Sequence, residues 1–232
     1  YPRAYKMIDE LQPQAVIFSD GGPGCRWVGN EHGFAGATNW SFLRAGEVYP
    51  GYPKYRELQY GHADGNQWVA AECDVSIRPG WFYHPEEDDR VKTVDELTDL
   101  YYRSVGHNAT LLLNFPVDRD GLIHPTDSAN AVNFHQNVQK QLAHNLLAGL
   151  SPKASDERGR TFSAKAVTDG DYDTYWATND DVISATIEFD LPQAEKINRM
   201  MLQEYIPLGQ RVKSFVVEYN QAGEWIPVKF NE

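Results

Sequence analysis

One stretch constrains the fold more than any other, the continuous apolar run ATLLLNF at 109–115. A run of this length is typical of a buried strand in a parallel sheet. The segment before it predicts a helix, because Thr93 and Glu96 form a capping box and apolar residues follow at helical spacing. Gly106 is expected to end this helix. A helix that leads into a parallel strand predicts an α/β fold.

The same alternation recurs along the first part of the chain. Strands are predicted at 15–19 and 67–75, and helices at about 3–12 and 128–147. This order fits the C-terminal part of a (β/α) TIM-like barrel. A closed barrel has eight strands, so about half of it is expected to lie outside this chain. The segment 20–65 has little periodicity and is predicted to be a long functional loop.

The composition changes near Ser151, where 151–157 has the character of a linker. Short alternating runs typical of antiparallel strands follow, at 185–191, 200–206, 214–219 and 225–228. They predict an antiparallel β-sandwich. We therefore expect two domains, the barrel part over 1–150 and the sandwich over 151–232, which stops in mid-pattern at Glu232.

Charge and hydropathy argue against several partners. The formal net charge is −12 and no cluster of basic residues counters it, which argues against binding to nucleic acid. No stretch approaches the roughly 20 apolar residues of a membrane span. The two cysteines, Cys25 and Cys73, are expected to be free buried thiols, with a single bridge as the alternative.

Carboxyl groups near the ends of the predicted strands are candidates for catalysis. Glu31 lies in the segment CRWVGNEHG, on the loop after the first strand, and such loops build the active sites of barrels. Two carboxyl groups are the minimum for glycoside hydrolysis. Glu72 and Asp74 are two positions apart in one strand and therefore point to the same face. For both, the alternative interpretation is a structural ion pair with Arg78 or Arg26.

The segment SIRPGWFYH, after the second strand, offers groups that bind sugars. Arg78 provides a rigid fork of donors, Trp81 a flat apolar face and His84 a polar ring. Trp27 is a further candidate contact, and together with Phe34 it is expected to shield Glu31 from water. The sequence has no nucleophile elbow, no phosphate-binding loop and no zinc-ligand spacing.

Three segments now support a resemblance to a known family. RWVGNE at 26–31, AECDVSIRPGWFY at 71–83 and LLLNFP at 111–116 resemble the C-terminal half of the barrel of α-L-fucosidases of glycoside hydrolase family 29. Within the family, they most resemble the branch that acts on α-1,3/1,4-linked fucose of Lewis-type glycans. The segment VTDGDYDTYW at 167–176 resembles an early loop of the discoidin-like sandwich that many members carry.

The resemblance implies a retaining exo-α-L-fucosidase that needs no cofactor for catalysis. Its substrate would be terminal fucose on oligosaccharides or glycoconjugates, which implies a secreted or periplasmic protein. Glu31 matches the general acid/base and Trp81 a wall of the fucose pocket. Glu72 and Arg78 are weaker candidates, either as sugar contacts or as groups that support the residues in contact with the sugar. The family's nucleophile is an aspartate in a Trp-Phe-Asp-Gly-like motif that is absent here, so we expect it upstream of Tyr1.

The second domain leaves two alternatives open. The loop at 169–174 is a candidate structural calcium site through Asp169, Asp171 or Asp173, as in some relatives, and the alternative is a solvated Asp-Gly turn.

A different function, a non-catalytic carbohydrate-binding protein, would use an aromatic platform on the sandwich. Its candidates are Tyr172, Tyr175 and Trp176, and for Trp176 the alternative is a position in the core. A hydrolase of another barrel family is the third hypothesis.

Overall fold

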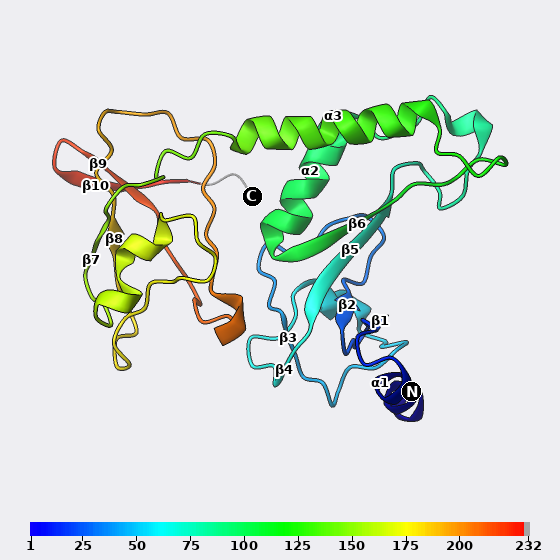
Figure 1. Ribbon diagram of the computed structural model, residues 1–232, viewed down its shortest axis with the longest axis horizontal. Helices are drawn as coiled ribbons and strands as arrows, with labels where there is room; N and C mark the ends of the chain where they lie inside the picture. Colours follow the sequence, from blue (N-terminus) through cyan, green and yellow to red (C-terminus); the bar gives the residue numbers. More distant parts are fainter. Residues whose placement is uncertain (230–232) are drawn as a thin grey trace. The chain divides into compact units, whose positions relative to one another are not determined.

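The structure, a computed structural model, describes residues 1–229 (Figure 1). Its internal contacts divide the chain into two units, Tyr1–Gln141 and a second unit that begins at Leu142. The boundary at residue 150 stays a prediction. Glu232, where the sandwich was predicted to stop, lies outside the described residues. The two units are described separately below.

A four-stranded sheet forms the centre of the first unit (Figure 1). The strands lie in the order β1 (Phe18–Ser19), β2 (Cys25–Trp27), β5 (Ala70–Ser76) and β6 (Ala109–Asn114). Each neighbouring pair is parallel, which confirms the predicted kind of sheet. The run at 109–115 is less buried than predicted, because β6 is an edge strand with one neighbour among the described residues.

Helix α2 (Val94–Ser104) packs against the sheet, and the predicted capping box is present. Glu96 accepts a hydrogen bond from the backbone N–H of Thr93 at 2.7 Å, and the Thr93 hydroxyl accepts from the Glu96 N–H at 3.3 Å. The helix does not end at Gly106 as predicted. A 3-10 turn, η3 (Val105–His107), continues it to Asn108, which adopts the left-handed conformation at φ 59°.

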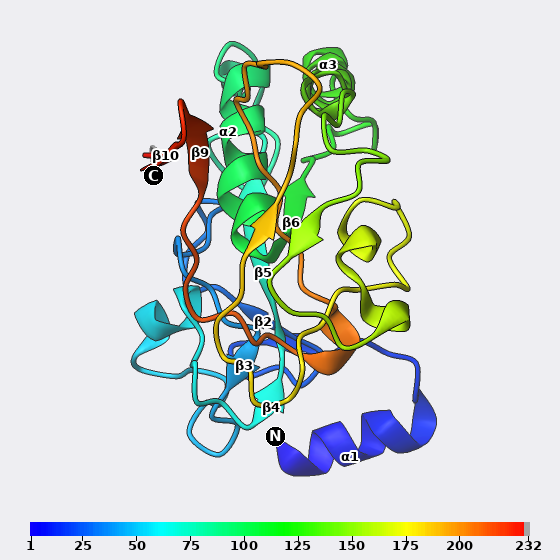
Figure 2. The ribbon, with the colours of Figure 1, turned by 90° about the vertical axis from the view of Figure 1, so that its left-hand side faces the viewer.

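The apolar core of this region joins α2 to the sheet and to helix α3 (Pro125–Leu142), which lies beside α2 in Figures 1 and 2. Its buried members are Val75, Ile77, Val91, Leu97 and Leu100, with Leu111, Leu113, Phe115 and Phe134 packed around them. By contrast, α1 (Pro2–Leu11) has no buried residue. None of the helices within residues 1–229 has the length and apolar character that crossing a membrane requires.

The segment 20–65, predicted to be one long functional loop, contains short regular elements. It contains β2, β3 (Phe42–Leu43) and the 3-10 helix η1 (Tyr55–Gln59), and β3 pairs antiparallel with β4 (Gln67–Trp68). The strand predicted at 67–75 is therefore two strands, β4 and β5. Buried Arg26 holds this segment together with hydrogen bonds to three acceptors, Leu58 O at 3.0 Å, Val69 O at 2.7 Å and Asn39 Oδ1 at 2.5 Å.

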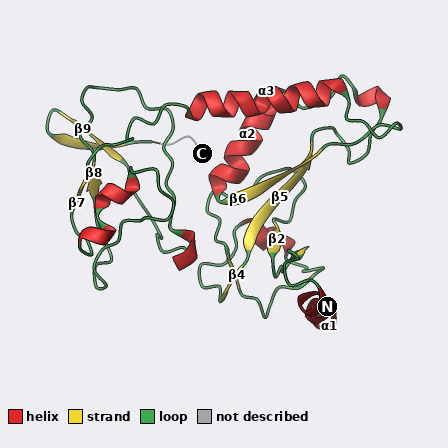
Figure 3. Ribbon diagram, in the orientation of Figure 1, coloured by secondary structure: helices red, strands yellow, loops and turns green. Residues whose placement is uncertain are grey.

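In the second unit, loops predominate (Figure 3). Strand β7 (Lys153–Ala154) pairs with β8 (Ile187–Glu188), and β9 (Glu218–Gln221) pairs with β10 (Glu224–Pro227). Both pairs are antiparallel, as predicted. Short 3-10 helices lie between them, η4 (Arg160–Phe162), η5 (Ala164–Val167) and η6 (Ile206–Leu208). Two expectations are wrong, since the predicted linker contains β7 and no strand forms at 200–206.

Candidate active site

The carboxyl end of the parallel sheet brings together Glu31 and Trp81, two residues singled out in the sequence. The Glu31 loop follows β2 and the Trp81 loop, which contains the short 3-10 helix η2 (Pro85–Glu87), follows β5. Because β2 and β5 are parallel neighbours, their loops leave the sheet at the same edge. The indole Nε1 of Trp81 donates to Glu31 Oε2 at 2.8 Å. A carboxyl group and an aromatic ring therefore lie side by side, two kinds of group that sugar-cleaving and sugar-binding sites use.

Contacts on several sides fix the loop that carries Glu31. The Val28 N–H donates to Glu72 O at 3.2 Å, and the Val28 side chain is fully buried. Gly29 has φ +78° and lies against the backbone of Tyr55, where any Cβ would collide. Asn30 donates to Phe34 O at 3.0 Å. These restraints leave little freedom to the backbone that carries the Glu31 carboxyl group.

The expected shield around Glu31 is not formed by Phe34. The Glu31 side chain is exposed, and the Phe34 ring instead stacks on His32 and lies under the guanidinium of Arg103. Trp27, the other expected member, is half-buried. Its Nε1 donates to Asp74 Oδ1 at 2.8 Å, and its ring stacks on Tyr55 with centroids 6.4 Å apart. Trp27 thus belongs to the same edge of the sheet, held by a carboxyl group.

Glu72 and Asp74 point to one face of β5, as their spacing predicted. Residues 70, 72 and 74 are half-exposed, whereas the alternate residues 71, 73 and 75 are buried. The interpretation that they pair with Arg78 or Arg26 is wrong, since their partners are Cys25 and Trp27. Desolvation raises the pKa of both carboxyl groups, and the neighbouring charge of Glu31 raises that of Asp74 further.

Arg78 is placed differently from its prediction as a sugar contact. It is 1% exposed, and its guanidinium donates to Asp127 at 2.8 and 2.9 Å and to Asp88 at 2.9 Å. The guanidinium also lies over the Tyr83 ring, 4.7 Å from its centroid. Because each of its nitrogens faces a protein acceptor, the contacts favour the supporting role of Arg78 over a sugar contact, and Arg78 holds the 77–88 loop.

His84 lies on the same loop but does not join Glu31 among the described contacts. Its ring Nδ1 is 3.9 Å from Glu86 Oε1, and its side chain is 55% exposed. Its carbonyl accepts from Arg78 Nη1 at 3.5 Å. A sugar contact by His84 stays a prediction.

Two residues that the sequence reasoning did not select also shape the site. Asn114, at the end of β6, donates to Trp81 O and to Ser76 Oγ, each at 3.1 Å. The signal for it was available, since Asn114 is a polar residue near the end of the apolar run at 109–115. No such signal marks Tyr55, which stacks on Trp27, because Tyr55 is distant in sequence from the other residues of the site and lies in an irregular segment.

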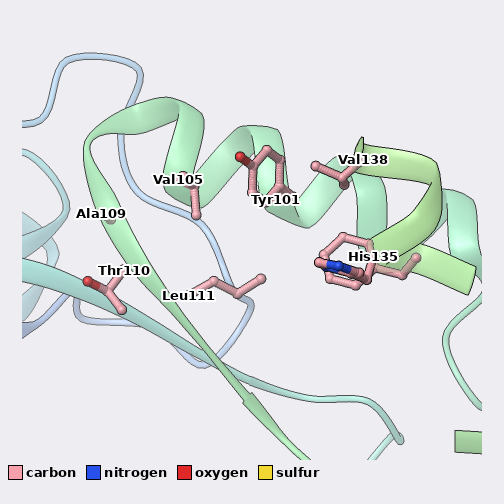
Figure 4. Close-up of a pocket in the computed structure, with 8 residues that line it drawn as sticks. Tyr101, Val105, Ala109, Thr110, Leu111, His135 and Val138 are labelled. Carbon is pink, nitrogen blue, oxygen red and sulfur yellow. The ribbon is translucent and has the colours of Figure 1, made fainter. Parts of the chain in front are cut away.

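A cavity lies elsewhere in the first unit. A hollow of about 450 Å³ lies between α2, β6 and α3 and is shown in Figure 4. It is lined mainly by apolar side chains, namely Tyr101, Val105, Ala109, Thr110, Leu111, Phe134, His135 and Val138. It contains no carboxyl group and touches the amino-terminal half of β6, whereas Glu31 and Trp81 lie past the carboxyl ends of their strands. We therefore place the site at the loops.

The acidic loop of the second unit makes hydrogen bonds with its own backbone. Asp169 Oδ1 accepts from the Asp171 N–H and Asp171 Oδ1 from the Asp173 N–H, both at 2.9 Å, and Asp169 Oδ2 accepts from the Thr174 hydroxyl at 2.7 Å. Across residues 1–229, no three His, Cys, Asp or Glu side chains gather as a metal site would require. The loop is thus closed by hydrogen bonds of its own, and calcium binding through Asp169, Asp171 or Asp173 stays a prediction.

The aromatic platform expected of a sugar-binding sandwich is only partly exposed. Tyr172 is 71% exposed, but the Tyr175 ring stacks on Tyr205 at 4.4 Å. Trp176 donates to Asp156 O at 3.0 Å and is half-buried. Two of the three rings are thus engaged within the unit, which favours their structural interpretation.

Comparisons with known proteins agree with the sequence motifs. Residues 151–232 match the F5/8 type C domain family. The α-L-fucosidase 1 of Arabidopsis thaliana is 37% identical over 231 residues, which are 95% of this chain and 44% of that protein. The chain spans about half the length, or less, of the relatives that it matches.

Solved structures show the same likeness. A structure of a candidate α-L-fucosidase from Bacteroides thetaiotaomicron superposes with a TM-score of 0.91 and 42% identity, over 98% of this chain and 51% of that one. A glycoside hydrolase family 29 fucosidase from Ruminococcus gnavus, in complex with fucose, gives a TM-score of 0.87 and 30% identity, over 98% of this chain and 48% of that one.

Proposed function

Because this chain is related over almost its whole length to the α-L-fucosidases of glycoside hydrolase family 29, we propose that the full-length protein is a retaining exo-α-L-fucosidase. The observation that carries the proposal is the 2.8 Å hydrogen bond from Trp81 to Glu31 at the carboxyl end of the sheet. The proposed fold is a (β/α) barrel, to which this chain contributes the carboxyl-terminal strands, followed by a discoidin-like sandwich.

Glu31 is the proposed general acid/base. In the first step, its protonated carboxyl group gives a proton to the glycosidic oxygen as the bond to fucose breaks. In the second step, the same group, now ionised, removes a proton from the water that releases fucose. Trp81 orients the Glu31 carboxyl through its N–H, and the face of its indole ring is available to the apolar side of a sugar.

The nucleophile is proposed to be an aspartate outside these 232 residues. No Trp-Phe-Asp-Gly-like motif occurs in the sequence, and the relatives are about twice as long. Retention requires the two carboxyl groups about 5–5.5 Å apart, so this aspartate would have to approach Glu31 from another barrel strand. The proposed substrate is terminal α-1,3/1,4-linked fucose of Lewis-type glycans, and the proposed location is secreted or periplasmic.

Calcium binding by the second unit stays a proposal, carried only by the likeness to relatives and the acidity of loop 169–174. Thermal unfolding of the full-length protein in calcium and in a chelator tests it, since a bound ion would raise the unfolding temperature.

The full-length protein tests the function directly. Incubated with a Lewis-type trisaccharide, it is expected to release L-fucose, and proton NMR at early times should show the α-anomer first. An initial β-anomer would contradict the retaining mechanism. Failure to release fucose from any α-L-fucoside would overturn the function.

A further inference from the structure

Two hydrogen bonds connect β2 and the loop after it to β5 and the loop after it. Strand β2 ends at Trp27, whose Nε1 donates at 2.8 Å to Asp74 of β5. The loop after β5 carries Trp81, whose Nε1 donates at 2.8 Å to Glu31, on the loop after β2. Each of the two chain segments thus supplies one tryptophan donor and one carboxyl acceptor, so neither loop is anchored only by its own strand.

Trp27 is held on two sides. Its N–H is fixed by Asp74, and one face of its ring stacks on Tyr55 at an interplanar angle of 22°. From Trp27 to Glu31 the backbone is then restrained at successive residues by the buried Val28, by Gly29 against Tyr55 and by the Asn30 hydrogen bond. A displacement of Trp27 would therefore be transmitted along this short segment to the Glu31 carboxyl.

The surroundings of Asp74 indicate that it holds the segment from Trp27 to Glu31 in place. It lies on the half-exposed face of β5, between Glu72 on its own strand and the Glu31 loop. Its described partner is the neutral N–H of Trp27, not an arginine or a lysine. The charged groups that act on it are carboxyl groups, Glu31 among them, so its position is not explained by charge pairing.

We propose that Asp74 is a positioning residue for the proposed hydrolysis: it holds Trp27 at the end of β2 and thereby sets the place of the Glu31 carboxyl. The inference rests on the proposed function. It assigns to Asp74 no contact with substrate, since its described bond is to Trp27. Its effect on the reaction must therefore pass through the acid/base.

This mechanism has a signature that a general loss of folding lacks. A misplaced acid cannot protonate a sugar leaving group, whereas a nitrophenolate leaves without protonation. The value of kcat/KM reports the first, bond-breaking step, so it should fall for a trisaccharide and change little for 4-nitrophenyl α-L-fucoside. A change that only lowers the folded fraction reduces both values by the same factor.

The experiment compares the two substrates in the full-length protein. Asp74→Ala should lower kcat/KM for a Lewis-type trisaccharide about tenfold or more relative to the nitrophenyl fucoside. Asp74→Asn should largely restore the ratio, because the amide oxygen still accepts from Trp27. Trp27→Phe, which removes the N–H donor and keeps a smaller aromatic ring, should resemble Asp74→Ala, and the double variant should lose little more than either single one. Asp89→Ala, at an exposed aspartate, is the matched control.

Several outcomes would overturn the inference. Equal losses on both substrates, unchanged ratios, or an Asp74→Asn variant as impaired as Asp74→Ala would each contradict positioning through Trp27. If Asp74→Ala does not fold, Trp27→Phe decides on the same criterion. A wild-type protein that cleaves neither substrate would instead reject the proposed function, together with the inference that rests on it.

Discussion

At the scale of residues, neutral groups donate to the carboxyl groups of this face. Glu72 accepts from the Cys25 thiol at 3.7 Å, Asp74 from Trp27 and Glu31 from Trp81. A neutral donor orients a carboxyl group without cancelling its charge. Desolvation by burial therefore still raises the pKa of Glu72 and Asp74. An arginine partner would have the opposite effect. The arrangement suits a site that must hold and release protons.

The raised pKa of Glu72 predicts a stability cost at neutral pH. A carboxyl group with a raised folded pKa contributes stability below its ordinary value, and this contribution is lost as the pH rises through the folded value. Glu72→Gln should therefore raise the unfolding temperature at pH 7, by about 1–3 °C, and the gain should shrink at pH 4. Glu218→Gln, at an exposed glutamate, is the control. A lower unfolding temperature at pH 7 would contradict the assignment.

The cysteines allow a second test at this scale. Both are free, as predicted, but only Cys73 is fully buried, since Cys25 is half-buried. Desolvation is the main cause that raises the pKa of Cys25 to about 11 and that of Cys73 to about 12. At pH 7.5 a rise from 9 to about 11 reduces the thiolate about 100-fold, so a thiol reagent should label the native protein far more slowly than the unfolded protein. Since Glu72 also raises the pKa of Cys25, Glu72→Gln should speed the labelling of Cys25. Equal native and unfolded rates would refute this.

Elements were predictable from the sequence where the pattern is local. The capping box at Thr93 and the apolar run at 109–115 located α2 and β6, because both signals lie within a few residues. Strand β2 was missed, because its three residues include an arginine that is buried only through acceptors distant in sequence. Glu31 and Trp81 were found from their motifs, but their mutual contact required the parallel register of β2 and β5.

The loop that carries Trp81 depends on a buried ion pair that connects it to α3. Arg78 and Asp127 are 1% and 0% exposed, so removing one partner leaves an uncompensated charge. Asp127→Ala should cost about 3 kcal/mol, the lower end of the usual range because Asp88 still pairs with Arg78. Asp88→Ala should cost about 1 kcal/mol or less, since Asp88 is 36% exposed.

Urea unfolding with a fluorescence readout measures both effects. Replacing the pair with apolar residues, as Arg78→Met with Asp127→Leu, should be less harmful than Asp127→Ala, because no buried charge remains. If Asp127→Ala and Asp88→Ala cost the same, the pair does not anchor the loop in the way we describe.

At the scale of the whole molecule, the proposed catalytic pair is divided between this chain and the rest of the protein. Residues 1–232 expressed alone should therefore release no fucose from a Lewis-type trisaccharide or from 4-nitrophenyl α-L-fucoside, whereas the full-length protein should cleave both. The assay is fucose release at matched concentration, with circular dichroism to show that the fragment is folded. Turnover by the fragment would show that its nucleophile lies among these residues.

The most direct test of the account is the replacement of Glu31 in the full-length protein. Glu31→Ala should lower kcat/KM for a Lewis-type trisaccharide by about 10²–10⁴-fold, because no acid remains to protonate the sugar leaving group. Activity on 4-nitrophenyl α-L-fucoside should be partly rescued by azide, which replaces water in the second step without needing a base. Near-normal cleavage of the trisaccharide by Glu31→Ala would contradict the assignment of Glu31 as the acid/base.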